Sequence, residues 1–141
     1  MKFLITGGAG FIGSAVIRHL IKDRGHEVIN IDKLTYAGDL QSIKEVERNE
    51  LYSFKEIDIC DSDQVRRVIA DCRPDVVINL AAESSGDRSI VNPSKFIQTN
   101  IVGTFALLEE VRHYWDKLEG GEKDKFRFLH ISTDEVFGSL G

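Results

Sequence analysis

The chain has 141 residues, with 18 Lys and Arg against 23 Asp and Glu, and a formal net charge of −5. This length is typical of one domain, so we expect residues 1–141 to form a single domain. An acidic balance without a basic stripe argues against a nucleic-acid partner, and no apolar run reaches the roughly 20 residues of a membrane span. Two cysteines, Cys60 and Cys72, are too few for a disulfide framework, which favours a reducing, cytoplasmic setting. The four histidines are scattered, so no metal site is predicted.

A glycine-rich turn joins a strand pattern to a helix pattern at the N-terminus. Residues 2–6 are short, apolar and β-prone, as expected of a first buried strand. The helix pattern that follows predicts one buried face, formed by Phe11, Ile12, Ala15, Val16, Leu20 and Ile21. The helix start, with its free N–H groups and the positive end of its dipole, is expected to bind phosphates.

Each glycine of the turn has an expected purpose. Gly7 and Gly8 permit backbone angles that a side chain would forbid. Gly10 lets the main chain approach a pyrophosphate, and Gly13 lets the helix pack closely on the strand. A glycine pattern alone is weak evidence, because ordinary turns also produce it.

An acidic residue supplies the second half of this dinucleotide-binding pattern. A second apolar strand, residues 26–31, ends at Asp32, at about the 20-residue distance where a carboxylate binds the ribose hydroxyls of NAD. The alternative for Asp32 is a turn or cap residue. Lys33 could attract a 2′-phosphate, but Asp32 would repel one, so we predict NAD rather than NADP.

Strand and helix patterns then alternate along the chain. Asp61 or Ser62 is expected to cap a helix that buries Val65, Val68 and Ile69. A polar, partly helical stretch is predicted at 39–49, a long helix after Pro93, and further strands at 51–57, 75–80 and 125–131. This order predicts an α/β fold with a doubly wound parallel sheet. The loops after the strands then converge on one edge, at Gly7, Asp32, Asp58, Ala81 and Ser132.

Two of these loops carry candidate cofactor contacts. Asp58 could accept a hydrogen bond from an adenine amino group while Ile59 covers the ring; a solvated helix-entry loop is the alternative. In residues 80–84, small side chains would let the backbone pass close to a flat cofactor, and Ser84 could reach a substrate hydroxyl.

Adjacent carboxylates follow the fifth predicted strand. Asp134 and Glu135 could be acidic residues in the first turn of a helix. Beside a nicotinamide pocket they would instead form an acid–base pair.

At this point the chain resembles the extended short-chain dehydrogenase/reductase family, and within it the dTDP-glucose 4,6-dehydratases. The resemblance covers the whole chain but only the first half of such an enzyme. The Thr133-Asp134-Glu135 triplet is its specific part, because related epimerases usually carry small hydroxyl residues there. The matching segments lie at 6–13, 32–38, 58–59, 80–84, 87–90, 99–104 and 132–136.

The resemblance implies NAD-dependent dehydration of dTDP-glucose to dTDP-4-keto-6-deoxyglucose. It implies that Glu135 removes the C5 proton, Asp134 protonates the departing C6 hydroxyl, and Thr133 hydrogen-bonds the C4 oxygen. Ser84 and Thr133 would contact the nucleotide sugar. The implied NAD site consists of Gly7, Gly10, Phe11, Ile12, Gly13, Asp32, Lys33, Leu34, Thr35, Asp58, Ile59, Leu80, Ala81, Ala82, Glu83, Ser84 and Thr99.

Three departures from the family pattern limit this expectation. The family oxidises its substrate with a Tyr-x-x-x-Lys pair, and these residues contain none; we expect the chain to end before the part that carries the pair, the last strands and the nucleotide-sugar domain. Ser85-Gly86 replaces the usual histidine and valine, and Phe137 replaces a common tyrosine.

We therefore expect this chain alone to bind NAD and to turn over nothing. The alternatives are a catalytically silent NAD-binding module and another nucleotide-sugar epimerase or decarboxylase. Relatives dimerise through the long helix, so its apolar residues between Phe96 and Trp115 predict a homodimer; packing on the sheet is the alternative.

Overall fold

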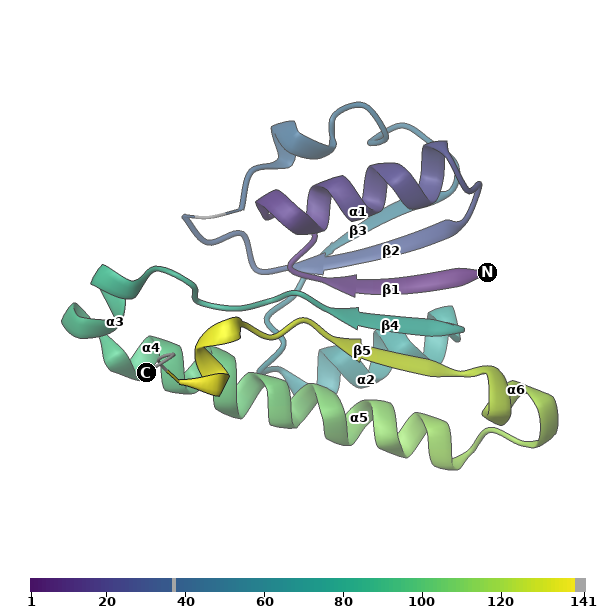
Figure 1. Cartoon of the computed structure of the whole chain (residues 1–141). Helices are drawn as coiled ribbons and strands as arrows, with labels where there is room; N and C mark the ends of the chain where they lie inside the picture. The colour runs from purple at the N-terminus through teal and green to yellow at the C-terminus, as the bar shows by residue number, and fades with distance from the viewer. Residues whose placement is uncertain (37, 139–141) are drawn as a thin grey trace.

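The computed structural model describes residues 1–36 and 38–138, without the side chains of residues 86–88 and 135. Five parallel strands form one sheet in the order β3-β2-β1-β4-β5. In Figure 1 their arrowheads all point to the left, so the carboxyl ends of the strands share one edge. The strands are β1 (Lys2–Thr6), β2 (Glu27–Asp32), β3 (Tyr52–Glu56), β4 (Val76–Asn79) and β5 (Arg127–His130). The predicted parallel sheet and its common edge are confirmed.

Helices cover both faces of this sheet, as the doubly wound prediction requires (Figure 1). The α-helices are α1 (Phe11–Lys22), α2 (Ser62–Cys72), α3 (Gly86–Val91), α4 (Pro93–Phe96), α5 (Thr104–Asp116) and α6 (Gly120–Lys125). Three other helical segments are the 3₁₀ turns η1 (Leu40–Ile43) and η3 (Asp134–Phe137) and the π-helix η2 (Ile97–Gly103). None of the helices among the described residues is long and apolar enough to cross a membrane.

Two apolar clusters, one on each face, hold the layers together. On the first face, Ile17 and Ile21 of α1 pack with Ile43 and Val46 against the sheet. On the second face, Val65 and Ile69 of α2 meet Leu107 of α5 over the same strands. Because both faces are covered, β4 is buried along its whole length, and β1 and β2 are buried except at their end residues, as expected of parallel strands inside a doubly wound fold.

The buried face of α1 differs from the predicted one. Gly13, Ser14, Ile17 and Ile21 are buried, whereas Phe11 is 93% exposed and Ile12 is 59% exposed. The first turn of α1 lies at the carboxyl edge, beyond the strands that would cover it. Its two large apolar side chains are therefore free to contact a ligand or another part of a protein.

The long helix predicted after Pro93 is divided into α4, η2 and α5, and this region presents two stripes. One stripe is buried against the sheet and α2, and it includes Thr99, Gly103, Leu107 and Val111. Gly103 allows this contact, because a Cβ atom there would lie 2.8 Å from Cγ1 of Ile59. The other stripe faces outward, and its exposed apolar side chains are Ile97, Ile101, Phe105, Leu108 and Trp115.

Local sequence features explain where α2 and α6 begin. Asp61 caps α2 and accepts from the backbone N–H of Gln64 at 3.0 Å, and Val65 and Ile69 are buried as predicted. Gly120 and Gly121 begin the short helix α6. Gly120 has a left-handed conformation, at φ +51°, which turns the chain into this helical segment.

Candidate active site

The glycine turn lies where β1 ends, in direct contact with the loop after β4. Gly7 has a left-handed φ of +70°, and a Cβ atom there would lie 2.6 Å from the backbone nitrogen of Ala81. Its N–H donates to the carbonyl oxygen of Ile31 at 3.0 Å. The prediction of an unusual backbone angle is therefore right for Gly7. It is wrong for Gly8, which has no left-handed φ and instead leaves room for the side chains of Asn30 and Ile17.

The first turn of α1 fits a phosphate-binding helix start. Gly10 is its N-cap, and within the described residues no side chain caps this end and no acidic residue lies in its first turn. A Cβ atom at Gly10 would meet the carbonyl oxygen of Gly7 at 3.3 Å and is otherwise unobstructed. Gly13 packs on the glycine turn itself, since its Cβ would lie 2.7 Å from Cα of Gly8. Main-chain N–H groups at this end are thus open to an anion.

Asp32 is fixed at the end of β2 by two backbone donors. Oδ2 accepts from the N–H of Ala9 at 2.9 Å, and Oδ1 accepts from the N–H of Leu34 at 2.8 Å. Leu34 has a φ of +53°, which folds the turn after β2 back over the carboxylate. An ionised carboxylate has about four acceptor positions, so both oxygens can still accept from a hydroxyl.

Lys33 lies beside Asp32 but its ammonium group points to other elements. Nζ donates to Oγ1 of Thr99 at 2.9 Å and lies 3.4 Å from Oδ2 of Asp58. Burial opposes ionisation of Asp58, but the N–H of Cys60, at 2.9 Å from Oδ1, and the Lys33 ammonium together hold its pKa below the usual value. Burial, and then the Asp58 carboxylate, raise the pKa of the Cys60 thiol.

Ile59 differs from its expected role as a cover for a ring. Its side chain is only 3% exposed and packs in the core with Val65 and Leu107. It therefore has little apolar surface to offer to a ligand.

The loop after β4 is held by polar contacts on both sides. The N–H of Ala81 donates to Oγ1 of Thr6 at 3.2 Å. Further along, Asn100 brackets the backbone of Glu83: its Oδ1 accepts from the Glu83 N–H at 2.8 Å and its Nδ2 donates to the Glu83 carbonyl at 2.9 Å. Leu80 and Ala81 are half-buried, Glu83 is buried, and Ala82 and Ser84 are exposed.

Sequence reasoning missed two sets of residues at this edge. A chain of hydrogen bonds joins Thr6, Asn79 and His130 across three strands, with Asn79 Nδ2 and His130 Nδ1 3.0 Å apart. The signal was present, since Thr6 and Asn79 are polar residues at the ends of apolar strands. The second set belongs to a cleft of about 480 Å³, in which Thr35 and Glu83, both expected in the cofactor site, are joined by residues that were not predicted: Tyr36, Val91, Asn92, Lys95 and Phe96. Its walls come from the loops after β2 and β4 and from the α3–α4 region, which the sequence did not indicate as neighbours.

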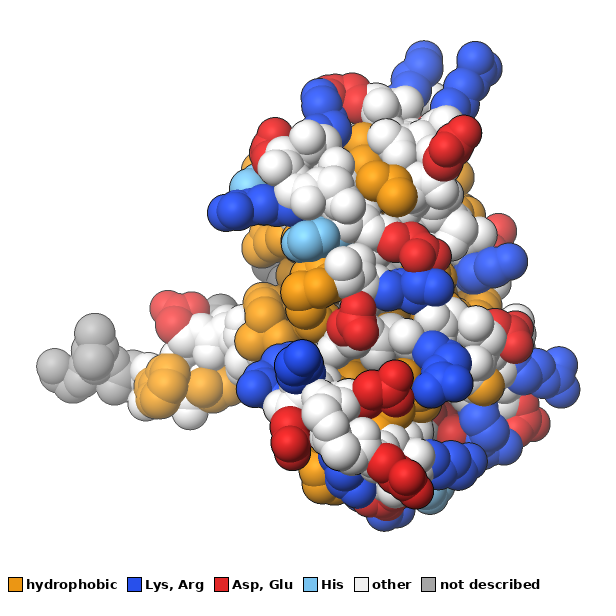
Figure 2. All heavy atoms as spheres, turned by 90° about the vertical axis from the view of Figure 1, so that its right-hand side faces the viewer, with side chains coloured by type: hydrophobic (Ala, Val, Ile, Leu, Met, Phe, Trp, Pro, Cys, Tyr) orange, Lys and Arg blue, Asp and Glu red, His pale blue; other side chains and the backbone are white. Residues whose placement is uncertain are grey.

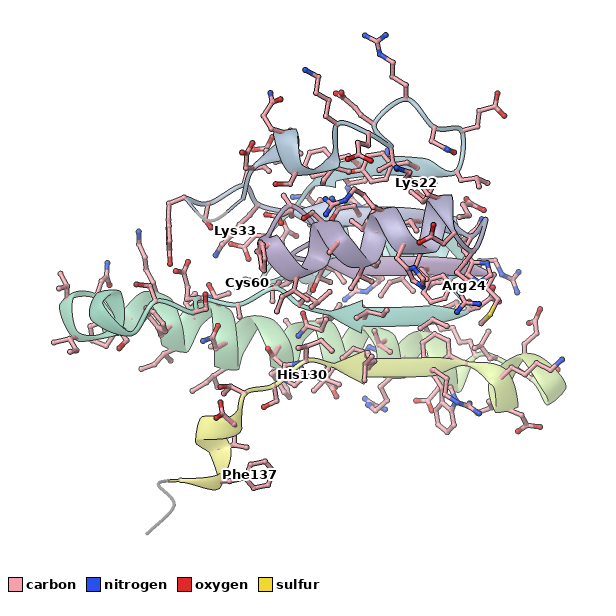
Figure 3. The ribbon with its side chains drawn as sticks, turned by 45° about the horizontal axis from the view of Figure 1, so that its top comes forward. Lys22, Arg24, Lys33, Cys60, His130 and Phe137 are labelled. Atoms are coloured by element: carbon pink, nitrogen blue, oxygen red, sulfur yellow. The ribbon has the colours of Figure 1, made fainter. Side chains whose placement is uncertain are left out.

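The segment after β5 lies apart from these groups. Thr133 and Asp134 are exposed, and the Thr133 hydroxyl lies 3.5 Å from Oδ1 of Asp134. The side chain of Glu135, the predicted base, lies outside the described residues. Figure 3 shows η3 extending from the sheet, with Phe137 directed away from it, and Phe137 is 89% exposed. The structure thus brings the predicted cofactor residues together and leaves the predicted acid outside their cluster.

Comparison with known proteins agrees with this geometry. Residues 4–141 match the family described as GDP-mannose 4,6 dehydratase. The chain therefore belongs to this family of nucleotide-sugar dehydratases, which has the extended short-chain dehydrogenase/reductase fold. The resemblance seen in the sequence is confirmed.

Individual relatives carry a more specific name. A dTDP-glucose 4,6-dehydratase from Escherichia coli is 59% identical over 140 residues, which are 99% of this chain and 39% of the relative. The crystal structure of DesIV, a dTDP-glucose 4,6-dehydratase from Streptomyces venezuelae with NAD and TYD bound, superposes with a TM-score of 0.86 at 38% identity. It covers 100% of this chain and 42% of DesIV.

Another branch of nucleotide-sugar enzymes is also similar. UDP-glucose 4-epimerase from Thermotoga maritima, solved with UDP-glucose, has a TM-score of 0.72 and 38% identity over 81% of this chain and 35% of its own. The chain spans about two fifths of the length of the curated relatives that it matches.

Proposed function

We propose that residues 1–141 are the NAD-binding domain of a dTDP-glucose 4,6-dehydratase. The observation that carries this proposal is the placement of Asp32, whose carboxylate is anchored to the glycine turn through the Ala9 N–H at 2.9 Å. One short segment thereby offers acceptors for ribose hydroxyls next to donors for a pyrophosphate. The identity of 59% to a dTDP-glucose dehydratase supports the particular substrate.

The residues of this edge fit a dinucleotide. The start of α1, which no described side chain caps, and Gly10, which has no side chain, leave room for phosphate oxygens. Asp58 provides an acceptor near the end of β3. Asp32 favours a free 2′-hydroxyl over a 2′-phosphate, and Lys33 is already engaged with Thr99 and Asp58. These features support NAD over NADP.

Bound NAD would supply a hydride acceptor and donor beside the sugar. Ser84 and Thr133 would hydrogen-bond the substrate, Asp134 would deliver a proton to the departing hydroxyl, and Glu135 would accept one from the neighbouring carbon. Elimination needs such an acid and base near one carbon–carbon bond, and neighbouring residues supply them. In the structure Asp134 is exposed at the start of η3.

We expect these 141 residues to bind NAD without turnover. They contain no Tyr-x-x-x-Lys pair, and the loss of a general base typically lowers a rate by about 10²–10⁴-fold. Two further features extend the proposal: the exposed stripe of η2 and α5 would form a homodimer interface, and the free thiols of Cys60 and Cys72 suit a reducing cytoplasm.

The test is calorimetric titration of the chain with NAD, followed by product analysis after incubation with NAD and dTDP-glucose. Saturable binding of one NAD per chain without a 4-keto sugar is the expected result. Absence of binding would refute the cofactor assignment. Formation of an epimerised sugar would instead identify the chain with the epimerase branch, which also shares the fold.

A further inference from the structure

Lys33 joins three elements that are far apart in the sequence. It follows β2, Asp58 follows β3, and Thr99 lies in the π-helix η2. Its Nζ donates to Oγ1 of Thr99 at 2.9 Å and pairs with Oδ2 of Asp58 at 3.4 Å. Figure 3 shows Lys33 and Cys60 at the same end of the sheet.

Both oxygens of Asp58 are thereby held in place. Oδ1 accepts from the backbone N–H of Cys60 at 2.9 Å, and Oδ2 faces the Lys33 ammonium. A carboxylate has about four acceptor positions, and the Cys60 backbone, the Cys60 thiol and Lys33 occupy at most three, so at least one is left for a ligand. The carboxylate is fixed in direction but still able to accept a hydrogen bond.

Thr99 gives the lysine a rigid support. It is 3% exposed, and it lies in the buried stripe that Gly103 allows to pack on Ile59. The ammonium group is thus attached to the core at one side and to Asp58 at the other. Two of its three N–H donors are used within the chain.

We infer that Lys33 is a positioning residue for adenine: it orients the Asp58 carboxylate to accept from the exocyclic amino group, and it does not bind a phosphate. This inference rests on the proposed NAD site. It makes Lys33 a determinant of the preference for adenine, and Lys33 exerts this effect by orienting Asp58. A flexible lysine that binds phosphate would instead leave the adenine preference unchanged when it is replaced.

The experiment compares NAD with nicotinamide hypoxanthine dinucleotide, in which a ring carbonyl replaces the amino group. Calorimetric affinities are measured for the chain, Lys33→Met, Lys33→Arg and the control Lys44→Met, which changes an exposed lysine on another element. The unchanged chain is expected to prefer NAD by about 10-fold or more, since hydrogen bonds to charged groups are among the stronger ones. Lys33→Met should lower this preference by roughly 3–10-fold. Lys33→Arg, which keeps the positive charge, should retain most of the preference, and Lys44→Met should leave it unchanged.

Each outcome decides a separate question. NAD binding with an unchanged preference in Lys33→Met overturns the inference and leaves the proposed function intact. No NAD binding by the unchanged chain overturns the proposed function and the inference together. If Lys33→Met does not fold, Lys33→Gln, which keeps a donor but loses the charge, gives the same comparison.

Discussion

Asp32 combines a structural role with the proposed ribose contact, because its two oxygens accept from the backbone of Ala9 and Leu34. We expect Asp32→Asn to weaken NAD binding by roughly 10–100-fold, since a hydrogen bond to a charged group is worth about 1.5–3 kcal/mol. The asparagine oxygen can still accept from the Ala9 N–H of the glycine turn, whereas its NH2 group cannot accept from the Leu34 N–H. Isothermal titration measures the affinity, and Asp71→Asn, an exposed site on α2, is the control for lost charge. Unchanged NAD affinity in Asp32→Asn would show that the ribose assignment is wrong.

Gly7 and Gly25 separate two reasons for glycine at a left-handed position. Both have positive φ, +70° and +61°, but a Cβ at Gly7 would lie 2.6 Å from the Ala81 nitrogen while none of the described atoms lies within 4 Å at Gly25. Gly25→Ala should cost only about 1–2 kcal/mol, for the left-handed conformation. Gly7→Ala should cost about 1–3 kcal/mol more, because the loop after β4 must move. Urea unfolding of the two variants tests this, and equal losses would contradict the close contact.

At the scale of the elements, the outward stripe of η2 and α5 is an apolar surface without cover from the described residues. Ile101 is 63% exposed and Phe105 is 64% exposed, on the side away from the sheet. We expect the chain to self-associate through this stripe, because burying such side chains on a second copy removes apolar surface from water. Phe105→Glu should shift the chain to monomer in sedimentation velocity. A monomeric unchanged chain would contradict the interface, and Lys44→Gln, which also makes the net charge one unit more negative, is the charge control.

The contact between α2 and α5 makes stability depend on pH. Arg66 pairs with the buried Glu110 through two bonds of 2.8 Å, and this hydrogen bonding lowers the pKa of Glu110 below its model-compound value of 4.5. A lowered pKa in the folded state stabilises the fold above the unfolded value, and this contribution is lost as the pH falls through the folded value. Arg66→Met should therefore lower the urea midpoint at pH 7 and have a much smaller effect at pH 3. An equal reduction at both pH values would assign the loss to packing of the arginine stem.

At the scale of the whole molecule, periodicity and turn residues predicted the sheet, because the central strands β1, β2 and β4 contain short apolar runs bounded by breakers. The same reasoning failed where neighbours decide burial. Phe11 and Ile12 have the right spacing for a core, but no strand reaches them at the edge. The helix after Pro93 has one apolar pattern but two environments, since only one side meets the sheet and α2.

The candidate site divides in the same way. Gly7, Asp32 and Asp58 were predictable because their spacing follows from a strand, a turn and a helix in fixed order. The links of Lys33 to Thr99 and of Asn100 to Glu83 join residues distant in sequence. No local pattern marks them, because they depend on how η2 packs across the sheet edge.

The two apolar clusters and the proposed NAD site at the carboxyl edge of the sheet are built on the same strands. NAD binding should therefore be coupled to unfolding of the whole chain. Because helices on both faces pack on β1 and β4, we expect one cooperative thermal transition, as for a single domain.

A ligand at 100 times its Kd stabilises the folded state by about 2.7 kcal/mol, which for a chain of this size raises Tm by roughly 8–13 °C. NAD should produce this shift in differential scanning calorimetry, and NADP at the same concentration should produce a much smaller one, because Asp32 disfavours a 2′-phosphate. Figure 2 shows Lys and Arg side chains interspersed with Asp and Glu on the face toward the amino ends of the strands, so a dinucleotide has no strongly basic surface to bind there. Equal shifts from the two dinucleotides would mean that they bind without recognition of the ribose, and two separate transitions would mean that the edge and the core are not one unit.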